Sequence, residues 1–546
     1  IIVWVVRQKQ NDSADYFLGG RDATWLAIGA SIFASNIGSE HLIGLAGAGA
    51  SSGMAMAHWE IQGWMILILG WVFVPFYSRS MVYTMPEFLE RRYNPQSRTI
   101  LSVISLVSYV LTKVAVTVYA GGLVFQQVFG IKELWGIDFF WIAAIGLVVL
   151  TALYTIFGGM KSVLYTSVLQ TPILLLGSLI ILVLGFKELG GWDEMMRVCG
   201  AVTVNDYGDT MTNLIRSNDD ANFPWLGALI GSAIIGFWYW CTDQFIVQRV
   251  LSGKNEKEAR RGTIFGAYLK LLPVFLFLIP GMIAFALHQK YIGAGGEGFL
   301  PMLANGNANA DAAFPTLVAK LLPAGVKGLV VCGILAALMS SLASLFNSSA
   351  MLFTIDFYKR FRPETPEKKL VGIGQIATVV IVILGILWIP IMRSVGDVLY
   401  TYLQDVQSVL APGIAAAFLL GICWKRTSAQ GGMWGLIAGM IIGLTRLGAK
   451  VYYSNAGEVA DSTFKYLFYD MNWLFFCGWM FLFCIIVVIV VSLATEAPTA
   501  EKIQGLVFGT ATKEQKAATR ASWDHWDIIH TVIILAITGA FYWYFW

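Results

Sequence analysis

Charge is the scarcest feature of this sequence. Of 546 residues only 13% are Asp, Glu, Lys or Arg, whereas 57% are hydrophobic. An ordinary soluble domain carries about 25% charged residues, and a soluble chain of this length would form several domains, each with a charged surface. The sequence lacks the charge for such surfaces, which argues against a soluble multidomain enzyme.

Cysteine pairs and a basic patch are also lacking. The six cysteines are scattered and form no C-x-x-C pair, which argues against a disulfide framework and against a zinc site. The 37 Lys and Arg nearly balance the 34 Asp and Glu, so the net charge is only +3, and there is no strong positive field to attract nucleic acid. The class of protein that these exclusions leave is a membrane protein with several spans.

Long hydrophobic runs are what the sequence has in their place. A helix needs about 20 apolar residues to cross a bilayer core about 30 Å thick. We predict 13 spans, at 24–48, 54–78, 99–126, 138–158, 162–186, 224–250, 263–287, 326–355, 370–392, 397–422, 431–453, 471–494 and 526–546. We interpret the apolar start of the chain as the end of one further helix. The runs are too long, and alternate too little, for a membrane β-barrel.

Most Lys and Arg residues fall in alternate loops between these runs. This bias predicts that one set of loops is cytoplasmic, namely 1–23, 79–98, 159–161, 249–262, 356–369, 423–430 and the polar linker 495–525. The longest loop of the other set, 187–223, is rich in Asp and Glu and is predicted to be extracellular. No N-x-S/T glycosylation acceptor lies in the loops predicted to be extracellular, so the sequence is compatible with a bacterial source.

Polar residues interrupt the first run at Ala34-Ser35-Asn36-Ile37-Gly38-Ser39-Glu40-His41. They could unwind the helix, and irregular backbone at that depth is tolerated only where it lines a cavity or is buried in protein. The alternative is a packing face of small residues between helices.

Ionisable residues within the runs include Glu60, Lys113, Asp243 and Lys270. Such residues are expected to face the protein interior and to mark a substrate or ion path. Asp243 is near the end of its run, so we expect an interfacial ion pair there. Lys113 is expected either to extend to the interface or to pair structurally. Glu60 and Lys270 lie deeper, which favours a functional role.

Ala337, Ser340 and Ser341 share one helix face because they are spaced i, i+3 and i+4. Two hydroxyls with a freed carbonyl would make an oxygen site for a hard cation, although such serines often bond to carbonyls of their own helix. The cluster Phe237-Trp238-Tyr239-Trp240 is typical of an interfacial aromatic belt, or it presents ring faces to a sugar.

Several segments together resemble the sodium/solute symporter family, and within it the sodium/glucose cotransporters. The segments that carry the resemblance are ASNIGSEHLIGLAGAGA (34–50), WYWCTDQFIVQR (238–249), YLKLLP (268–273), LMSSLASLFNSSAMLFTIDFY (338–358) and FLLGICWKR (418–426). The resemblance implies an all-α LeuT-type fold of two inverted five-helix repeats, 24–186 and 224–422. Peripheral helices would follow in 423–546, and each repeat would start with a broken helix.

The resemblance also implies a sodium site and a sugar site. The sodium ligands would be backbone carbonyls and hydroxyls of Ala34, Ile37, Ala337, Ser340 and Ser341. The sugar site would draw on Asn36, His41, Glu60, Tyr239, Trp240, Lys270 and Gln404. Tyr239 matches the inner gate of the family, and Leu45, Trp59 and Tyr400 match the outer gate. Ser167 stands where family members usually have an Asp that is associated with a second sodium ion, so we expect one ion.

The predicted function is therefore sodium-coupled import of a monosaccharide, similar to glucose or galactose, through the plasma membrane, or the inner membrane of a bacterium. Alternatives are another solute, such as inositol or an amino acid, and a sensor that binds sugar without transport. A proton could replace sodium, but neither Ser340 nor Ser341 titrates near neutral pH, as a proton site requires. An intramembrane hydrolase is the weakest rival, because His58 and Glu60 form no H-E-x-x-H pair.

Overall fold

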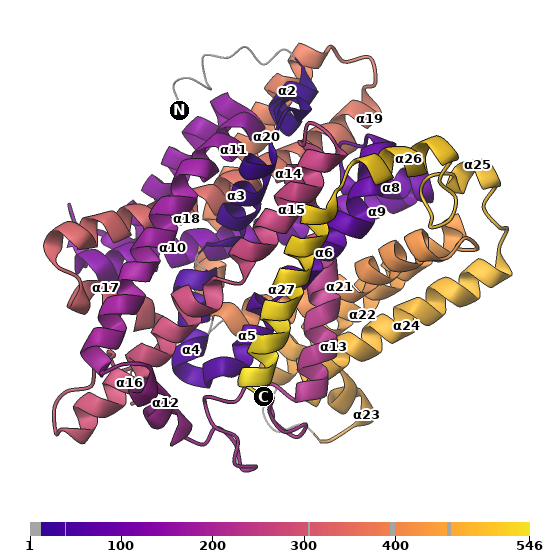
Figure 1. Ribbon diagram of the computed structural model, residues 1–546. Helices are drawn as coiled ribbons and strands as arrows, with labels where there is room; N and C mark the ends of the chain where they lie inside the picture. Colours follow the sequence, from indigo (N-terminus) through magenta and orange to yellow (C-terminus); the bar gives the residue numbers. More distant parts are fainter. Residues whose placement is uncertain (1–11, 39, 304–305, 394–398, 456–459) are drawn as a thin grey trace.

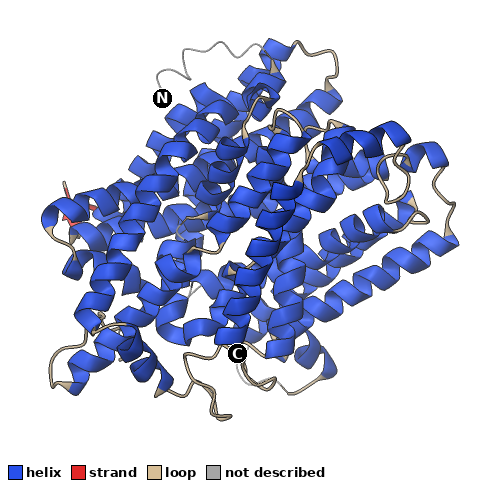
Figure 2. Ribbon diagram, viewed as in Figure 1, coloured by secondary structure: helices blue, strands red, loops and turns tan. Residues whose placement is uncertain are grey.

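The computed structural model describes residues 12–546 except 39, 304–305, 394–398 and 456–459. The described part is almost entirely helical (Figure 2), and its two strands, β1 (Glu133–Leu134) and β2 (Ile137–Asp138), form a small antiparallel hairpin. Helices predominate because a membrane offers no water to the backbone, so each N–H and C=O must be bonded within its own segment.

The first half of the chain forms helices that are often interrupted by 3₁₀ or π-helical turns, labelled η. Its elements are α2 (Ser13–Leu18), η1 (Gly19–Arg21), α3 (Trp25–Asn36), η2 (Glu40–Leu45), α4 (Ala46–Ser52), η3 (Gly53–Met56), α5 (Ala57–Glu60), α6 (Gly63–Ile68), η4 (Leu69–Phe73), α7 (Val74–Ser80), α8 (Met85–Arg92), α9 (Pro95–Ser108), η5 (Tyr109–Val114), α10 (Ala115–Phe129), α11 (Phe139–Leu189) and α12 (Trp192–Gly200).

The second half begins with another interrupted helix and ends in longer, less interrupted ones. Its elements are α13 (Trp225–Gly236), η6 (Phe237–Thr242), α14 (Gln244–Leu251), α15 (Glu256–Lys270), η7 (Val274–Leu278), α16 (Ile279–Gly293), η8 (Ala310–Ala312), α17 (Ala313–Leu321), α18 (Ala324–Met351), η9 (Leu352–Tyr358), α19 (Lys359–Phe361), α20 (Glu367–Arg393), α21 (Leu399–Cys423), α22 (Ala429–Asn455), α23 (Thr463–Lys465), η10 (Tyr466–Asp470), α24 (Trp473–Ala494), α25 (Ala500–Ile503), α26 (Lys513–Ala521) and α27 (His525–Tyr544).

Ten helices of the described residues are long and apolar enough to cross a membrane. This number is smaller than the 13 predicted spans for local reasons. The runs 24–48 and 99–126 are broken, and their shorter apolar pieces are Trp25–Asn36 and Ala115–Gln126. The runs 138–158 and 162–186 follow one another without a loop in α11.

Helix α11 is nevertheless bent sharply at Gly159. It has 51 residues, and Gly159 has φ 52° and ψ −149°. The hydroxyl of Ser162 donates to the carbonyl of Tyr154 at 3.2 Å, although eight residues of straight helix rise about 12 Å. A Cβ on Gly159 would lie 2.4 Å from the carbonyl oxygen of Tyr16, so only glycine fits. The two predicted spans are therefore two helices that meet at this turn.

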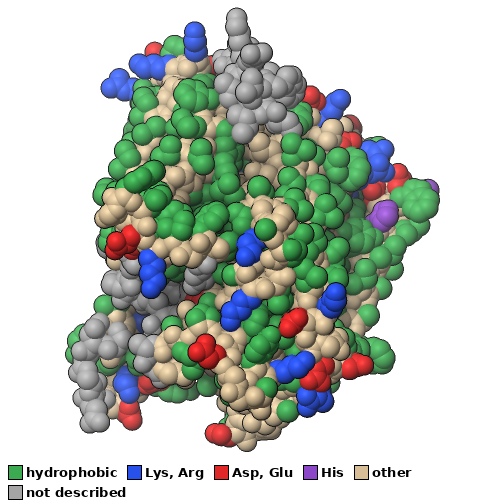
Figure 3. Space-filling model, turned by 90° about the vertical axis from the view of Figure 1, so that its left-hand side faces the viewer, with side chains coloured by type: hydrophobic (Ala, Val, Ile, Leu, Met, Phe, Trp, Pro, Cys, Tyr) green, Lys and Arg blue, Asp and Glu red, His purple; other side chains and the backbone are tan. Residues whose placement is uncertain are grey.

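The loops predicted to be cytoplasmic gather at one end of the molecule. In Figure 1, α2, α8, α19, α25 and α26 lie toward the top, whereas α12, α23 and the C-terminus lie at the bottom. Figure 3 shows hydrophobic side chains across the upper half of one face, with charged side chains at the top and over the lower half. This separation agrees with the orientation that the Lys and Arg bias predicts.

Candidate functional site

The first predicted broken helix is interrupted at the end of α3, which lies beside the middle of α18. The last backbone bond of α3 runs from the N–H of Ile37 to the carbonyl of Phe33 at 2.9 Å, and Ile37 itself is extended, with φ −80° and ψ 104°. The hydroxyls of Ser35 and Ser344 lie 2.6 Å apart and join α3 to α18. The predicted interruption is therefore real: α3 ends at Asn36, and the last turn of a helix leaves carbonyls without a partner within that helix.

The five residues expected to bind sodium are all buried: Ala34, Ile37, Ala337, Ser340 and Ser341. Gly38, at the break, faces Ser341 so closely that a Cβ on Gly38 would lie 3.1 Å from the Ser341 hydroxyl oxygen. The hydroxyl of Ser340 lies 3.2 Å from that of Ser167 on α11. Hydroxyl oxygens thus lie beside the unwound backbone, as a site for a hard cation requires.

A buried charged group lies beside the same break. The ammonium of Lys270 is 2.6 Å from the Glu60 carboxylate and 3.2 Å from the Asn36 side-chain oxygen. His41 Nε2 lies 3.2 Å from the same Glu60 oxygen. Each of these four side chains is at least 95% buried. Burial of ionised groups requires such pairing, so α3, η2, α5 and α15 are connected here by one network.

The second broken helix contributes the aromatic residues. The π-helical turn η6 ends at Thr242, and the next residue, Asp243, is extended with φ −75° and ψ 127° and caps α14 with its side chain. Tyr239 in this turn accepts a hydrogen bond from the Asn36 amide at 3.1 Å. The indole N–H of Trp240 donates to the side-chain oxygen of Gln62 at 3.2 Å, and the Lys270 ammonium lies 5.4 Å from a Trp240 ring centre.

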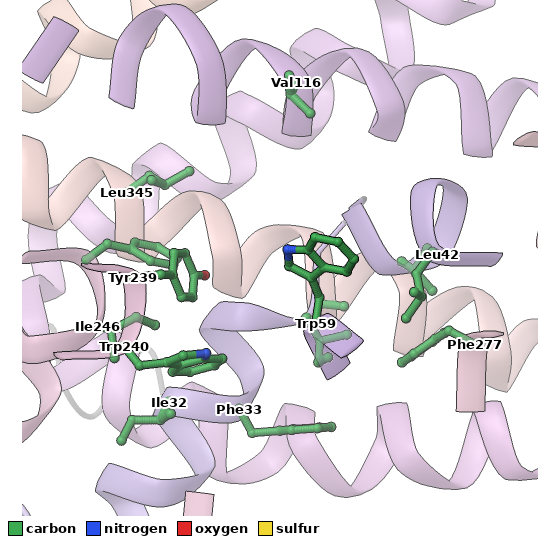
Figure 4. Close-up of a cluster of buried hydrophobic side chains, with 14 of the residues drawn as sticks. Ile32, Phe33, Leu42, Trp59, Val116, Tyr239, Trp240, Ile246, Phe277 and Leu345 are labelled. Carbon is green, nitrogen blue, oxygen red and sulfur yellow. The ribbon is translucent and has the colours of Figure 1, made fainter. Parts of the chain in front are cut away.

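These side chains enclose a small cavity. It offers about 40 Å³ to the centre of a water-sized sphere and is lined by Asn36, Glu40, His41, Trp59, Glu60, Gln62, Ile235, Gly236, Tyr239, Trp240, Lys270, Gln404 and Gln407. All seven residues of the predicted sugar site are among them. In Figure 4 the hydroxyl of Tyr239 and the indole nitrogen of Trp59 point toward each other from different helices.

Within the described part of the chain, three buried polar atoms of the cavity residues have no hydrogen-bond partner: His41 Nδ1, Trp59 Nε1 and Gln404 Oε1. A buried polar atom without a partner costs about 1–3 kcal/mol, so each such atom requires an explanation, and at a cavity a bound molecule supplies one. A donor, an acceptor and an imidazole nitrogen suit a molecule whose groups can both donate and accept, such as a hydroxyl.

Asp243 and Lys113 form an ion pair, but its position corrects our expectation of an interfacial one. The two charged groups are 2.6 Å apart, and both residues are at least 97% buried. Tyr109 also donates to Asp243, and the ammonium of Lys113 is 4.7 Å from the ring centre of Tyr239. The break in the second helix moves Asp243 inside the protein, so Lys113 neither extends to the interface nor lines the cavity.

Two of the expected gate residues are not brought to the cavity by the described structure. Leu45 is fully buried at the end of η2 and does not line the cavity. Tyr400 belongs to α21, but its side chain lies outside the described residues. Conversely, the cavity includes Glu40, Gln62 and Gln407, which the sequence analysis did not assign to the site. The only feature of the sequence that pointed to Glu40 is its position within the polar interruption of the first run.

Gly38 provides a test of how close the break lies to α18. In the Gly38→Ala variant the new methyl group would be 3.1 Å from the Ser341 oxygen and 3.3 Å from its Cβ, so Ser341 must shift by a few tenths of an ångström. We expect the sodium concentration for half-maximal uptake to rise about fivefold, since such crowding costs on the order of 1 kcal/mol.

Gly177→Ala on α11 is the matched control, because its methyl group would be in ordinary contact with Val330, 3.5 Å away. Sodium titration of uptake measures both variants. Equal sodium dependence of Gly38→Ala and the control would contradict the assigned role of Ser341.

Comparisons with known proteins show which family and which fold the chain resembles. The sequence profile described as "Sodium:solute symporter family" matches residues 16–439. "Sodium/myo-inositol cotransporter 2" of Homo sapiens is 36% identical over 518 residues, which cover 92% of this chain and 76% of that protein. "Sodium/myo-inositol cotransporter" of Bos taurus is 37% identical over 525 residues, which cover 92% and 72%. The solved structure of a Na⁺-coupled sialic acid symporter in a substrate-bound outward-open state matches in fold, with a TM-score of 0.71 and 22% identity over 91% of this chain and 95% of that chain.

Proposed function

Because the chain belongs to the sodium:solute symporter family, we propose that it couples sodium entry to the import of a neutral ring polyol across the plasma membrane. The polyol is a monosaccharide similar to glucose or galactose, or a cyclitol such as inositol. The predicted family, the LeuT-type fold and the multi-pass membrane location are confirmed, and sodium is the co-transported ion. The substrate, the site residues and the repeat boundaries remain proposals.

The observation that carries the polyol proposal is the mixture of groups around the cavity. Rings of Trp59, Tyr239 and Trp240 offer apolar faces, while His41, Glu60, Lys270 and Gln404 offer polar atoms. A sugar or cyclitol has apolar C–H faces for the rings and a belt of hydroxyls that can both donate and accept. The three buried atoms without partners would be satisfied by those hydroxyls.

The charges around the cavity support a neutral substrate. Lys270 and Glu60 are paired with each other at 2.6 Å, and Glu40 adds a second carboxylate to the lining. An anion, or the carboxylate of an amino acid, would enter a site with two carboxylates and one ammonium, and like charges in a buried site repel. A polyol avoids this cost.

Sodium and polyol binding are connected through the unwound stretch. Asn36, whose side chain contacts both Lys270 and Tyr239, is separated from Gly38, beside Ser341, by one residue. An ion held between the freed carbonyls and Ser340 and Ser341 would order this stretch and thereby position Asn36 for the substrate. Each ligand then raises the affinity for the other by the same factor.

The small cavity supports alternating access. A water needs roughly 10–15 Å³ by this measure, so 40 Å³ accommodates about three waters and no ring polyol. The helices around Tyr239 and Trp59 must therefore separate for a substrate to enter or leave. We propose that Tyr239, held by Asn36, closes the cytoplasmic side and that Trp59 closes the extracellular side while the bundle rocks around the site.

Uptake into proteoliposomes tests the proposal. One charge moving through 100 mV releases about 2.3 kcal/mol and a tenfold sodium gradient about 1.4 kcal/mol, so one sodium per substrate supports about 500-fold accumulation. We expect labelled glucose, galactose or myo-inositol to accumulate in sodium buffer, with a reversal potential that gives one ion per substrate. Equal accumulation in potassium or choline buffer would refute sodium coupling.

A panel of hexoses, cyclitols and amino acids identifies the substrate. Inositol is the second candidate because of the sodium/myo-inositol cotransporters that are 36–37% identical to this chain. Binding without accumulation would indicate a sensor. The hydrolase alternative lacks support, because His58 bonds to the Tyr542 hydroxyl and the Leu214 carbonyl. In addition, Gly49-Ala50-Ser51-Ser52-Gly53 has G-x-S-x-G spacing but ends a helix rather than joining a strand to one.

A further inference from the structure

Three buried aromatic rings, those of Trp59, Trp473 and Phe223, meet beside the cavity. The indole of Trp59 is stacked on that of Trp473, with ring centres 5.5 Å apart and planes 23° apart. Phe223 contacts Trp59 edge to face at 6.2 Å. Each of the three residues is at least 91% buried, but of the three only Trp59 lines the cavity.

Both partners of Trp59 come from outside the helices that form the cavity. Trp473 is the first residue of α24, and Phe223 ends the predicted extracellular loop 187–223. The loop is fixed where it reaches Phe223, because the Asp220 carboxylate accepts hydrogen bonds from the backbone N–H groups of Asn222 and Phe223 at 2.9 and 2.7 Å. Asn472, just before α24, donates to the Ala221 carbonyl at 2.7 Å.

Arg216 strengthens this attachment from the other side. Its guanidinium lies 5.7 Å from the ring centre of Phe223 and 3.7 Å from Asp220, and it donates to the carbonyl of Ser52 at the end of α4. The loop is therefore attached to the first broken helix as well as to α24. The two rings that hold Trp59 belong to one connected structure.

We propose that Trp473 and Phe223 are positioning residues of the extracellular gate, which hold Trp59 over the substrate cavity. The inference rests on the proposed function, in which Trp59 closes that side. Apart from an edge contact with its chain neighbour His58 at 6.5 Å, Trp59 has an indole N–H with no hydrogen-bond partner among the described residues, so hydrogen bonds do not fix its rotamer. The stacked face of Trp473 and the edge of Phe223 supply the packing that does. A peripheral helix and a loop thus control access to a site built by other helices.

Chemical accessibility tests the positions of these rings without any transport measurement. Ile235 lines the cavity, so an Ile235→Cys reporter is placed in a background with the exposed Cys332 and Cys423 changed to serine. A membrane-impermeant maleimide is then added outside intact cells. We expect Trp473→Ala and Phe223→Ala each to raise the rate of alkylation about fivefold, because Trp59 leaves its closed position more often. Trp473→Phe keeps a stacked ring and should restore the slow rate.

Trp479→Ala is the matched control. Trp479 lies on the same helix but is 61% exposed on the surface of the molecule, so its loss should leave alkylation unchanged. Sodium entry into proteoliposomes without substrate is the second readout, and we expect Trp473→Ala to raise this leak about threefold and Trp473→Phe to leave it unchanged.

Unchanged alkylation in both Trp473→Ala and Phe223→Ala, with folded protein, would overturn the inference. So would equal increases in Trp473→Ala and Trp473→Phe, since loss of packing alone would explain them. The proposed function and the role of the two rings can be tested separately. Absence of sodium-driven uptake in the unmodified protein would refute the proposed function. The alkylation result would still decide whether Trp473 and Phe223 hold Trp59.

Discussion

Replacing Lys270 by alanine is expected to lower substrate affinity and uptake at least about 100-fold while sodium binding remains. Lys270 donates to Glu60 at 2.6 Å and to Asn36 at 3.2 Å, and it is 96% buried. Removing one partner of a buried ion pair costs about 3–5 kcal/mol, and 100-fold corresponds to about 2.7 kcal/mol. The effect falls on the substrate because the same ammonium faces the cavity.

Sodium binding should survive because Lys270 is no part of the proposed sodium site. Lys270 contacts the broken helix at Asn36, which lines the substrate cavity. Substrate binding by calorimetry and sodium binding by ²²Na⁺ titration of detergent-solubilised protein separate the two effects. Loss of both together would mean that Lys270 supports the fold of the whole centre.

A charge-neutral double variant separates binding from stability. In Glu60→Gln with Lys270→Gln neither ion is left unpaired, so we expect thermal stability to return toward that of the unmodified protein while substrate affinity stays low. Lys290→Ala is the matched control, because its ammonium bonds to the Leu189 carbonyl and does not line the cavity. Normal uptake by Lys270→Ala would show that the substrate site is placed wrongly.

The sequence predicts most of this fold because a membrane imposes a simple rule. Apolar runs must be helical, and the alternation of Lys and Arg orders their ends. What hydropathy does not show is where a helix bends without leaving the membrane. Gly159 turns α11 by its backbone conformation alone, and Leu271–Pro273 separates α15 from η7, although both stretches are apolar.

The sequence also predicts which polar residues matter, because an ionised group within an apolar run is costly unless it is used or paired. It does not show which group pairs with which. Glu60 and Lys270 are 210 positions apart, and Lys113 and Asp243 are 130 apart. The neutral residues Gln62 and Gln407 were missed because an amide costs less to bury than a charge and gives a weaker signal.

Replacing Ser341 by alanine should raise the sodium concentration required for half-maximal uptake about 30-fold. The hydroxyl of Ser341 lies beside Gly38 at the helix break, where it can contact an ion held by the freed carbonyls. A hydrogen bond to a charged group is worth about 1.5–3 kcal/mol, and by the same scale the loss of one oxygen ligand costs about 2 kcal/mol, or about 30-fold. The substrate affinity at saturating sodium should change little, because Ser341 does not line the cavity.

Ser349→Ala is a stringent control, since Ser349 is a buried serine of the same helix whose hydroxyl bonds to no other described residue. Its removal leaves no group unsatisfied, so sodium dependence should be unchanged. Ser340→Ala should have a smaller effect than Ser341→Ala, because the Ser340 hydroxyl is shared with Ser167 and Ser167 can partly replace it. If all three variants show the sodium dependence of the unmodified protein, the ion is bound elsewhere, and the hydroxyls of α18 serve only to pack it against α3 and α11.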